Sequence, residues 1–242
     1  ISSLAKGSDL VGRIFFDNEL PNNEERYWRV FVLDQFKDNT WSSNSKENIN
    51  FKLNNNLVAS IQNNINNIKA ETWILEPNYI QERPWSGYGN PVDRNMRISN
   101  KGKLIGEKDL KKRKEYQISG IKNSWRLVSP NNRKNNIDKS YNKRAYALGK
   151  KWAKESINQE AIIYKAEKFF KEGGYEYSMN PGLMNKNAPY DDFLFNKKTG
   201  FCEHFAGSFT LLMNHANIPA RVVVGYQGGK ELENFEDKNY LL

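Results

Sequence analysis

The stretch at 199–229, TGFCEHFAGSFTLLMNHANIPARVVVGYQGG, holds the only cysteine of the chain between a helical pattern and a strand pattern. Its apolar residues recur at steps of three and four, which predicts a helix that begins at Cys202. Asn217 tolerates the left-handed conformation that ends a helix, and Pro219 blocks any continuation. The valine-rich run at 220–226 then predicts a buried strand. The apolar helix face consists of Phe201, Phe205, Phe209, Leu212 and Ala216.

A cysteine at a helix N-terminus has a particular chemistry. The unpaired N–H groups and the helix dipole favour negative charge, and so they enrich the nucleophilic thiolate. A backbone N–H at the same helix end can also hold an oxyanion. The alternative interpretation is that Cys202 is an inert, buried, small apolar residue. Position alone leaves both interpretations open.

The motifs GFCEHFAGSF at 200–209 and NIPARVVVGYQGG at 217–229 resemble the transglutaminase-like superfamily of papain-like cysteine enzymes. DDFLF at 191–195 matches the bacterial branch whose catalytic domain lies outside the cytoplasmic membrane on a membrane-embedded protein, and YWRVFVLDQFKDNTW at 27–41 resembles its N-terminal part more weakly. The resemblance implies that Cys202 is the acyl-accepting nucleophile. It also implies protein or peptide substrates with glutamine and amine donors, and a periplasmic or extracytoplasmic site on the bacterial inner membrane. Contact with the membrane would then come from segments outside this chain.

In that family a histidine and then an aspartate, on later strands, complete the catalytic triad. The sequence ends at Leu242, where the family would enter the histidine strand, so we expect both residues beyond it. Of the two histidines present, His204 is two residues from Cys202 on the same helix, and the two side chains therefore point to different faces. His215 lies several turns farther along. The 242-residue chain alone is therefore expected to be inactive.

The order of patterns predicts an α+β protein. A strand-rich N-terminal domain at 1–135 precedes a papain-like, transglutaminase-like core at 136–242, in which the nucleophile's helix packs on an antiparallel sheet. The polar, turn-rich stretch 129–142 is the expected linker. Tyr27, Trp28 and Trp41 are expected in the core rather than in a sugar-binding patch. Strands are expected at 11–17, 27–36, 70–82 and 115–128, with a tight turn at Asp38 and Asn39. A polar stretch at 86–106 is expected to separate the last two strands. Helices are expected at 143–154 and from a capping box of Ser156 and Gln159 to about residue 172.

Charge and composition narrow the partners and cofactors. The net charge of +9 suits an anionic partner, but the basic run KDLKKRK at 108–114 lacks the aromatic pattern of nucleic-acid readers. We therefore expect this run to be a solvated loop and no nucleic acid to bind. A single cysteine permits no internal disulfide or cysteine-based zinc cluster. No phosphate loop, metal cluster or dinucleotide motif occurs, so no cofactor or metal is predicted, and no run is apolar enough to span a membrane.

Three functions remain open from the sequence. The first is transfer of a glutamine acyl group to an amine, the second is hydrolysis on the same scaffold as a peptidase or amidase, and the third is a non-catalytic module that binds the cell envelope. Tyr226, Gln227 and Gly228 close the strand after the cysteine helix and are predicted to line a substrate cleft. The acidic residues nearest to the cysteine have either a capping or a catalytic role. They are Asp191, Asp192 and Glu203.

Overall fold

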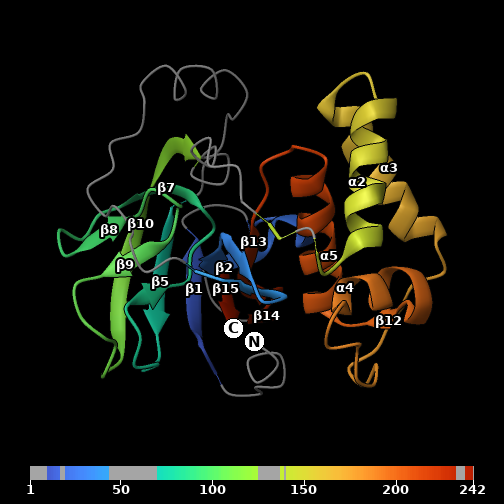
Figure 1. The fold of residues 1–242 in the computed structure, drawn as a ribbon. Coiled ribbons are helices and arrows are strands. Elements are labelled where there is room, and N and C mark those ends of the chain that lie inside the picture. The colour runs from blue at the N-terminus through green and yellow to red at the C-terminus, as the bar shows by residue number, and fades with distance from the viewer. Residues whose placement is uncertain are drawn as a thin grey trace. The chain divides into compact units, whose positions relative to one another are not determined.

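The computed structural model describes residues 10–16, 20–43, 70–124, 137–138, 140–232 and 238–241, which form two compact units (Figure 1). The helical unit contains the described residues of Leu33–Asn44 and Ser129–Val222. The strand unit contains those of Gly7–Val32, Ser45–Val128 and Val223–Leu242. These units do not coincide with the predicted division at 135/136, because each draws on both halves of the chain. Whether 1–135 and 136–242 are separable domains stays a prediction.

The strand unit is built on a six-stranded antiparallel sheet. Its central strands alternate buried and half-buried residues, as expected for a sheet with one face on the core. The two C-terminal strands pair next to the first strand of the chain, although the sequence had placed that region in the core with the cysteine. The order is β14 (Lys230–Leu232), β15 (Lys238–Leu241), β1 (Gly12–Phe16), β5 (Glu71–Leu75), β10 (Lys114–Ser124) and β7 (Tyr88–Pro91).

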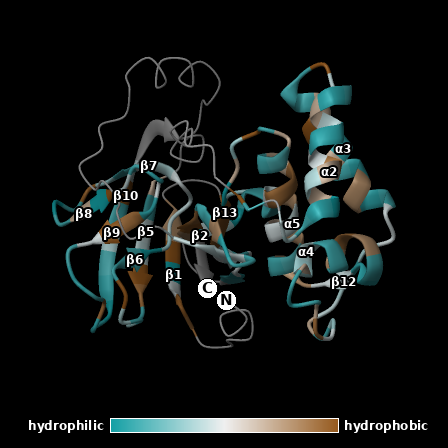
Figure 2. Ribbon diagram, in the orientation of Figure 1, coloured by the Kyte–Doolittle hydropathy of each residue, from teal (hydrophilic) through white to brown (hydrophobic). Residues whose placement is uncertain are grey.

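Aromatic side chains fill the core of the strand unit. Trp28 and Trp73 are fully buried and meet edge to face, with ring centroids 5.6 Å apart. Trp73 stacks on Tyr116 at 5.8 Å. The predicted core position of Trp28 is thus confirmed, and in Figure 2 the hydrophobic colour is prominent on β1 and β5.

Smaller sheets complete the strand unit. The predicted strand at 220–226 is confirmed as β13 (Val222–Gln227), which pairs with β2 (Tyr27–Leu33). The prediction that 86–106 only separates strands is wrong, because this stretch contains β7, β8 (Met96–Ile98) and β9 (Leu104–Gly106). These strands, of three or four residues each, are too short for a periodic pattern to identify them. A 3-10 turn, η2 (Asn23–Glu25), and β6 (Glu82–Arg83), which pairs with β9, are the remaining elements.

The helical unit packs three helices, α2 (Lys143–Glu155), α3 (Gln159–Glu172) and α5 (Cys202–His215), against one another. Figure 2 shows hydrophobic colour along α5, which has more buried residues than either α2 or α3. The predicted helices at 143–154 and from Cys202 are confirmed. Shorter elements are the hairpin β3 (Gln35–Lys37) and β4 (Thr40–Ser42), the parallel pair β11 (Glu176–Tyr177) and β12 (Thr199–Gly200), α4 (Pro189–Asp192) and the π-helical turn η3 (Phe193–Lys197).

Most of the predictions for turns and helix ends are confirmed. Asp38 and Asn39 have φ of 48° and 59°, the pair of positive angles that a two-residue hairpin turn requires. Asn217 has φ of 64° just after α5. The predicted capping box at Ser156 is wrong: the Asn158 side chain caps α3, accepting the Ala161 N–H at 2.8 Å. Most of the predicted linker at 129–142 lies outside the described residues.

Candidate active site

Cys202 is the first residue of α5, and its side chain is exposed. The chain reaches it from β12, where the Ser178 N–H donates to the Gly200 carbonyl at 2.8 Å. A Cβ at Gly200 would lie 2.7 Å from the Phe193 ring and 2.8 Å from the His204 Cβ, so only glycine fits at this position, two residues before Cys202. Cys202 is therefore not a buried residue, and its reactivity stays a prediction.

The first turn of α5 offers hydrogen-bond donors beside the thiol. The N–H groups of His204 and Phe205 are used locally, since both donate to the Phe201 carbonyl. In the described part of the chain, nothing accepts a hydrogen bond from the N–H groups of Cys202 or Glu203. An exposed thiol and backbone donors without a described acceptor therefore share one helix end, and this arrangement can hold the negative oxygen that forms when a thiolate attacks a carbonyl.

His204 has a structural role in this turn. Its Nδ1 accepts the Phe201 N–H at 3.4 Å, as the third helical residue of a capping box does. Its ring lies edge-on to Phe201, with centroids 4.5 Å apart, and 5.5 Å from Phe193. The pKa of His204 is lowered by burial, and the Glu203 carboxylate offsets only part of this shift. His204 is thus a neutral acceptor in the helix start, on a different face from Cys202.

His215 is even less suited to act as a base for the thiol. It is buried near the far end of α5 and lies edge-on to Tyr146, with centroids 5.2 Å apart. Gly149 of α2 approaches the same residue, because a Cβ there would lie 2.6 Å from the His215 Cβ. His215 therefore belongs to the packing of α2 on α5.

The neighbouring aspartates accept structural hydrogen bonds, and Asp191 caps a helix. Both Asp191 oxygens accept backbone N–H groups of α2, from Arg144 at 2.9 Å and Ala145 at 2.8 Å. Asp192 accepts the Asn185 N–H and the Asn196 side-chain amide, each at 3.0 Å, and the bond from Asn196 lowers the Asp192 pKa. Glu203 lies exposed in the first turn of α5, where a carboxylate suits the helix dipole.

Two aromatic residues hold α5 at its second turn, and the sequence patterns did not reveal them. Trp41 Nε1 donates to the Gly207 carbonyl at 3.2 Å. A Cβ at Gly207 would lie 2.9 Å from the Tyr190 hydroxyl, so the absence of a side chain admits this ring. Burial raises the pKa of Tyr190. The signal in the sequence was a glycine inside a strongly apolar helix, which often marks a close approach.

The predicted substrate-lining residues lie in the strand unit, whereas Cys202 lies in the helical unit. Tyr226 is half-buried against the aromatic core, and burial raises its pKa. Gly228, with φ of 79°, accepts the Trp28 Nε1–H at 2.9 Å and donates to the Arg26 carbonyl at 2.8 Å. Gln227 is exposed. A substrate-binding role for all three stays a prediction.

The chain matches the sequence profile of the transglutaminase-like superfamily over residues 146–240. It is homologous to the protein-glutamine gamma-glutamyltransferase of Pseudomonas aeruginosa, with 25% identity over 95% of this chain and 34% of that protein. Identity to YebA, an uncharacterized protein of Bacillus subtilis, is 29% over 37% of this chain and 12% of that one. The chain thus spans about a third or less of the length of these relatives.

A solved structure has a similar fold. The crystal structure of the periplasmic domain of TgpA from Pseudomonas aeruginosa, bound to ethylmercury, matches with a TM-score of 0.85 at 22% identity, over 99% of this chain and 84% of that one. The predicted mixed α and β fold with a strand-rich N-terminal region is thereby confirmed. In the part of the chain that the structure describes, no cluster of three metal-binding side chains occurs, and no helix has the length and apolarity of a membrane span.

Proposed function

We propose that this chain carries the nucleophile of a protein-glutamine gamma-glutamyltransferase and that Cys202 is that nucleophile. The observation that carries the proposal is the exposed thiol at the start of α5, next to unused N–H groups, in a chain with a transglutaminase-like domain. The homologous Pseudomonas aeruginosa protein bears the name of this activity.

The reaction has two steps. The Cys202 thiolate attacks the side-chain carbonyl carbon of a glutamine, and the carbonyl oxygen becomes negative in the tetrahedral intermediate. The N–H groups of Cys202 and Glu203 are donors for that oxygen. The C–N bond then breaks, ammonia leaves with an added proton, and a thioester remains. A primary amine attacks the thioester carbon, the C–S bond breaks, and the thiolate is restored as the amine loses a proton.

Proton transfer in both steps requires a base that neither histidine of the chain provides. His204 accepts a backbone N–H, and His215 is buried in the packing of α2 on α5. As the resemblance to the transglutaminase-like superfamily implies, we propose that a histidine and an aspartate outside residues 1–242 complete the triad. The loss of general acid–base help alone slows such a reaction by about a hundredfold or more.

The proposed site of action is the extracytoplasmic face of a bacterial inner membrane, on protein or peptide substrates that provide glutamine and amine groups. Support comes from the likeness to a periplasmic domain and from homology to a transferase about three times as long as this chain, since the chain covers 34% of it. Membrane attachment would be made by parts of the protein outside these residues.

Incorporation of a fluorescent primary amine into a glutamine-containing protein tests the proposal. A form extended beyond Leu242 through the proposed histidine and aspartate should incorporate the amine, and Cys202→Ala in that form should abolish incorporation. Ala206→Ser, at an exposed position of the same helix, is the matched control and should retain activity. Undiminished incorporation by Cys202→Ala would overturn the proposed nucleophile. Ammonia release without incorporation would instead identify a hydrolase.

A further inference from the structure

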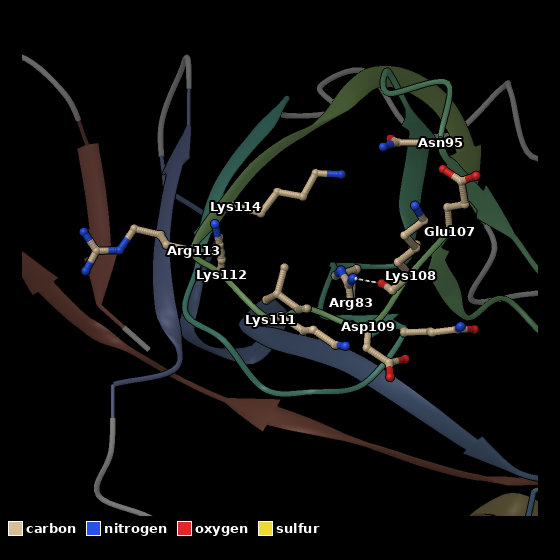
Figure 3. A pocket seen from close by; sticks show the side chains of 12 residues that line it. Arg83, Asn95, Glu107, Lys108, Asp109, Lys111, Lys112, Arg113 and Lys114 are labelled. Atoms are coloured by element: carbon tan, nitrogen blue, oxygen red, sulfur yellow. Dashed lines mark hydrogen bonds between the residues drawn. The ribbon is translucent and has the colours of Figure 1, made fainter.

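A cavity of about 770 Å³ opens in the strand unit, within the range of sites that hold small ligands. Its wall is formed by the basic run at 108–114 together with residues of the 3-stranded sheet, and Figure 3 shows the lining side chains. Six lining residues are basic and two are acidic, which leaves an excess of positive charge. The basic ones are Arg83, Lys108, Lys111, Lys112, Arg113 and Lys114, and the acidic ones are Glu107 and Asp109.

Arg83 distinguishes this cavity from a patch of solvated lysines. The residue is only 2% exposed, and its guanidinium donates to backbone carbonyls, including that of Lys108 at 2.7 Å (Figure 3). Among the described residues, no carboxylate forms a salt bridge with Arg83, and its buried Nε has no acceptor. Burial of a cation without an ion-pair partner is costly, and the carboxylates of Glu82 and Asp109 favour the charge of Arg83 without forming an ion pair with it. An anion in the cavity would offset that cost.

Packing and hydrogen bonds hold the guanidinium of Arg83 in a fixed position. Its guanidinium lies against Gly106, where a Cβ would come within 2.9 Å of Nη2. The Lys108 carbonyl, which accepts a hydrogen bond from Nη2, also ties the start of the basic run to this side chain. Arg83 therefore fixes the position of the segment that supplies the other cations.

Most of the surrounding cations remain available. Arg113 is neutralised by Glu76, with a shortest N–O distance of 2.8 Å, and it points away from the other labelled side chains in Figure 3. The ammonium groups of Lys108, Lys111, Lys112 and Lys114 form no ion pair with any described residue. Lysines act as compact point charges that suit phosphate, and a buried arginine adds directional donors.

We propose that this cavity binds a ligand with two or more phosphate groups, held by Arg83 and the lysines of the basic run. The lining has no aromatic side chain on which a nucleic-acid base could stack, so the ligand is a phosphate compound other than single-stranded nucleic acid. Two sources share this chemistry: a free oligophosphate and the phosphate groups of an envelope polymer. The sequence had indicated only a solvated loop here.

Calorimetric titration with inorganic triphosphate, at low and constant ionic strength, tests the proposal, because salt screens such contacts. A glycerol phosphate oligomer and citrate are titrated in parallel. We expect saturable binding of a phosphate probe and weaker binding of citrate. Binding of the oligomer assigns a polymer-borne phosphate, and binding of triphosphate alone assigns a small soluble one. No saturable binding of either, or citrate binding as tight as that of the phosphates, would overturn the proposal.

Single variants locate the site. Lys111→Gln and Lys114→Gln should each weaken binding by roughly three- to tenfold, as expected for the loss of one charge-assisted contact. Lys230→Gln removes the same charge at an exposed residue of β14 that does not line the cavity, and it should leave affinity within about twofold. Equal losses for all three variants would mean attraction by net charge alone and would contradict a built site. Arg83→Met should abolish binding, and circular dichroism establishes whether it folds; the lysine variants decide the outcome if it does not.

Discussion

The side chains of Asn142 and Asp191 cap each other's helices. Asn142 precedes α2, yet its Oδ1 accepts the N–H groups of Tyr190 and Asp191 in α4, at 3.1 and 3.2 Å. Asp191 in turn accepts two N–H groups from the first turn of α2. The Asn142 amide also donates to Asn39 at 2.8 Å, which ties in the β3–β4 hairpin. Two buried side chains thus fix two helix starts together.

Removal of the Asp191 carboxylate should therefore destabilise the fold. Asp191→Ala leaves two backbone donors without acceptors, one of them on a buried residue, and we expect the free energy of unfolding to fall by about 2 kcal/mol. Asp192→Ala, whose partners are exposed, should cost roughly 0.5–1 kcal/mol. Urea denaturation measures both. Equal stability of Asp191→Ala and the wild type would show that the reciprocal caps do not stabilise the fold.

His204 should make stability depend on pH. Its pKa is lowered in the folded state, so its contribution is fully present above the unfolded value of about 6.5 and is lost as pH falls through the folded value. Protonation of Nδ1 also removes the acceptor for the Phe201 N–H. As the pH falls below about 6.5, the free energy of unfolding of the wild type should decrease by more than that of His204→Gln. Glutamine keeps a capping-box acceptor but does not titrate.

The control for that comparison is His204→Ala, which lacks both the acceptor and the titration. It should be less stable than His204→Gln at pH 8 by about 1 kcal/mol, the usual value of one hydrogen bond. Urea midpoints measured across the pH range for the three proteins give the comparison. Parallel curves for wild type and His204→Gln would contradict the assigned role of His204.

Gly207→Ala should destabilise α5, although alanine is intrinsically the better helix former by about 1 kcal/mol. The added methyl group would lie 2.9 Å from both the Cε1 and the hydroxyl of Tyr190, and overpacking costs about 1–3 kcal/mol. Tyr190→Leu in the same protein should recover part of the loss. A double-mutant cycle measures this coupling, and additive effects would show that the two residues do not compete for space.

The sequence was most informative where the signal is local. The start of α5 at Cys202, the left-handed Asn217 and the Asp38–Asn39 turn each follow from neighbouring residues, and the structure confirms them. The reciprocal caps could not be foreseen, because Asn142 and Asp191 are far apart in sequence and meet only after α2 and α4 pack. For the same reason the pairing of β15 with β1 was missed.

The candidate site shows the same division. The position of Cys202 at the start of α5 is readable from helix periodicity and glycine placement, whereas the role of His204 depends on a hydrogen bond to Phe201 and on two phenylalanine rings. The burial of Arg83 could not be predicted from the sequence, because an arginine buried without an ion-pair partner is recognisable only in the folded structure.

The most direct test of the central claim is to trap the acyl group on Cys202. The form extended beyond Leu242 is incubated with a glutamine-containing peptide without an amine acceptor, then quenched in acid and analysed by peptide mass spectrometry. We predict a thioester on the peptide that contains Cys202, whose mass increases by that of the substrate peptide minus ammonia. Hydroxylamine should remove this adduct, and the Cys202→Ala variant should not form it. An acyl adduct on any other residue, or amine transfer that persists in Cys202→Ala, would contradict the account.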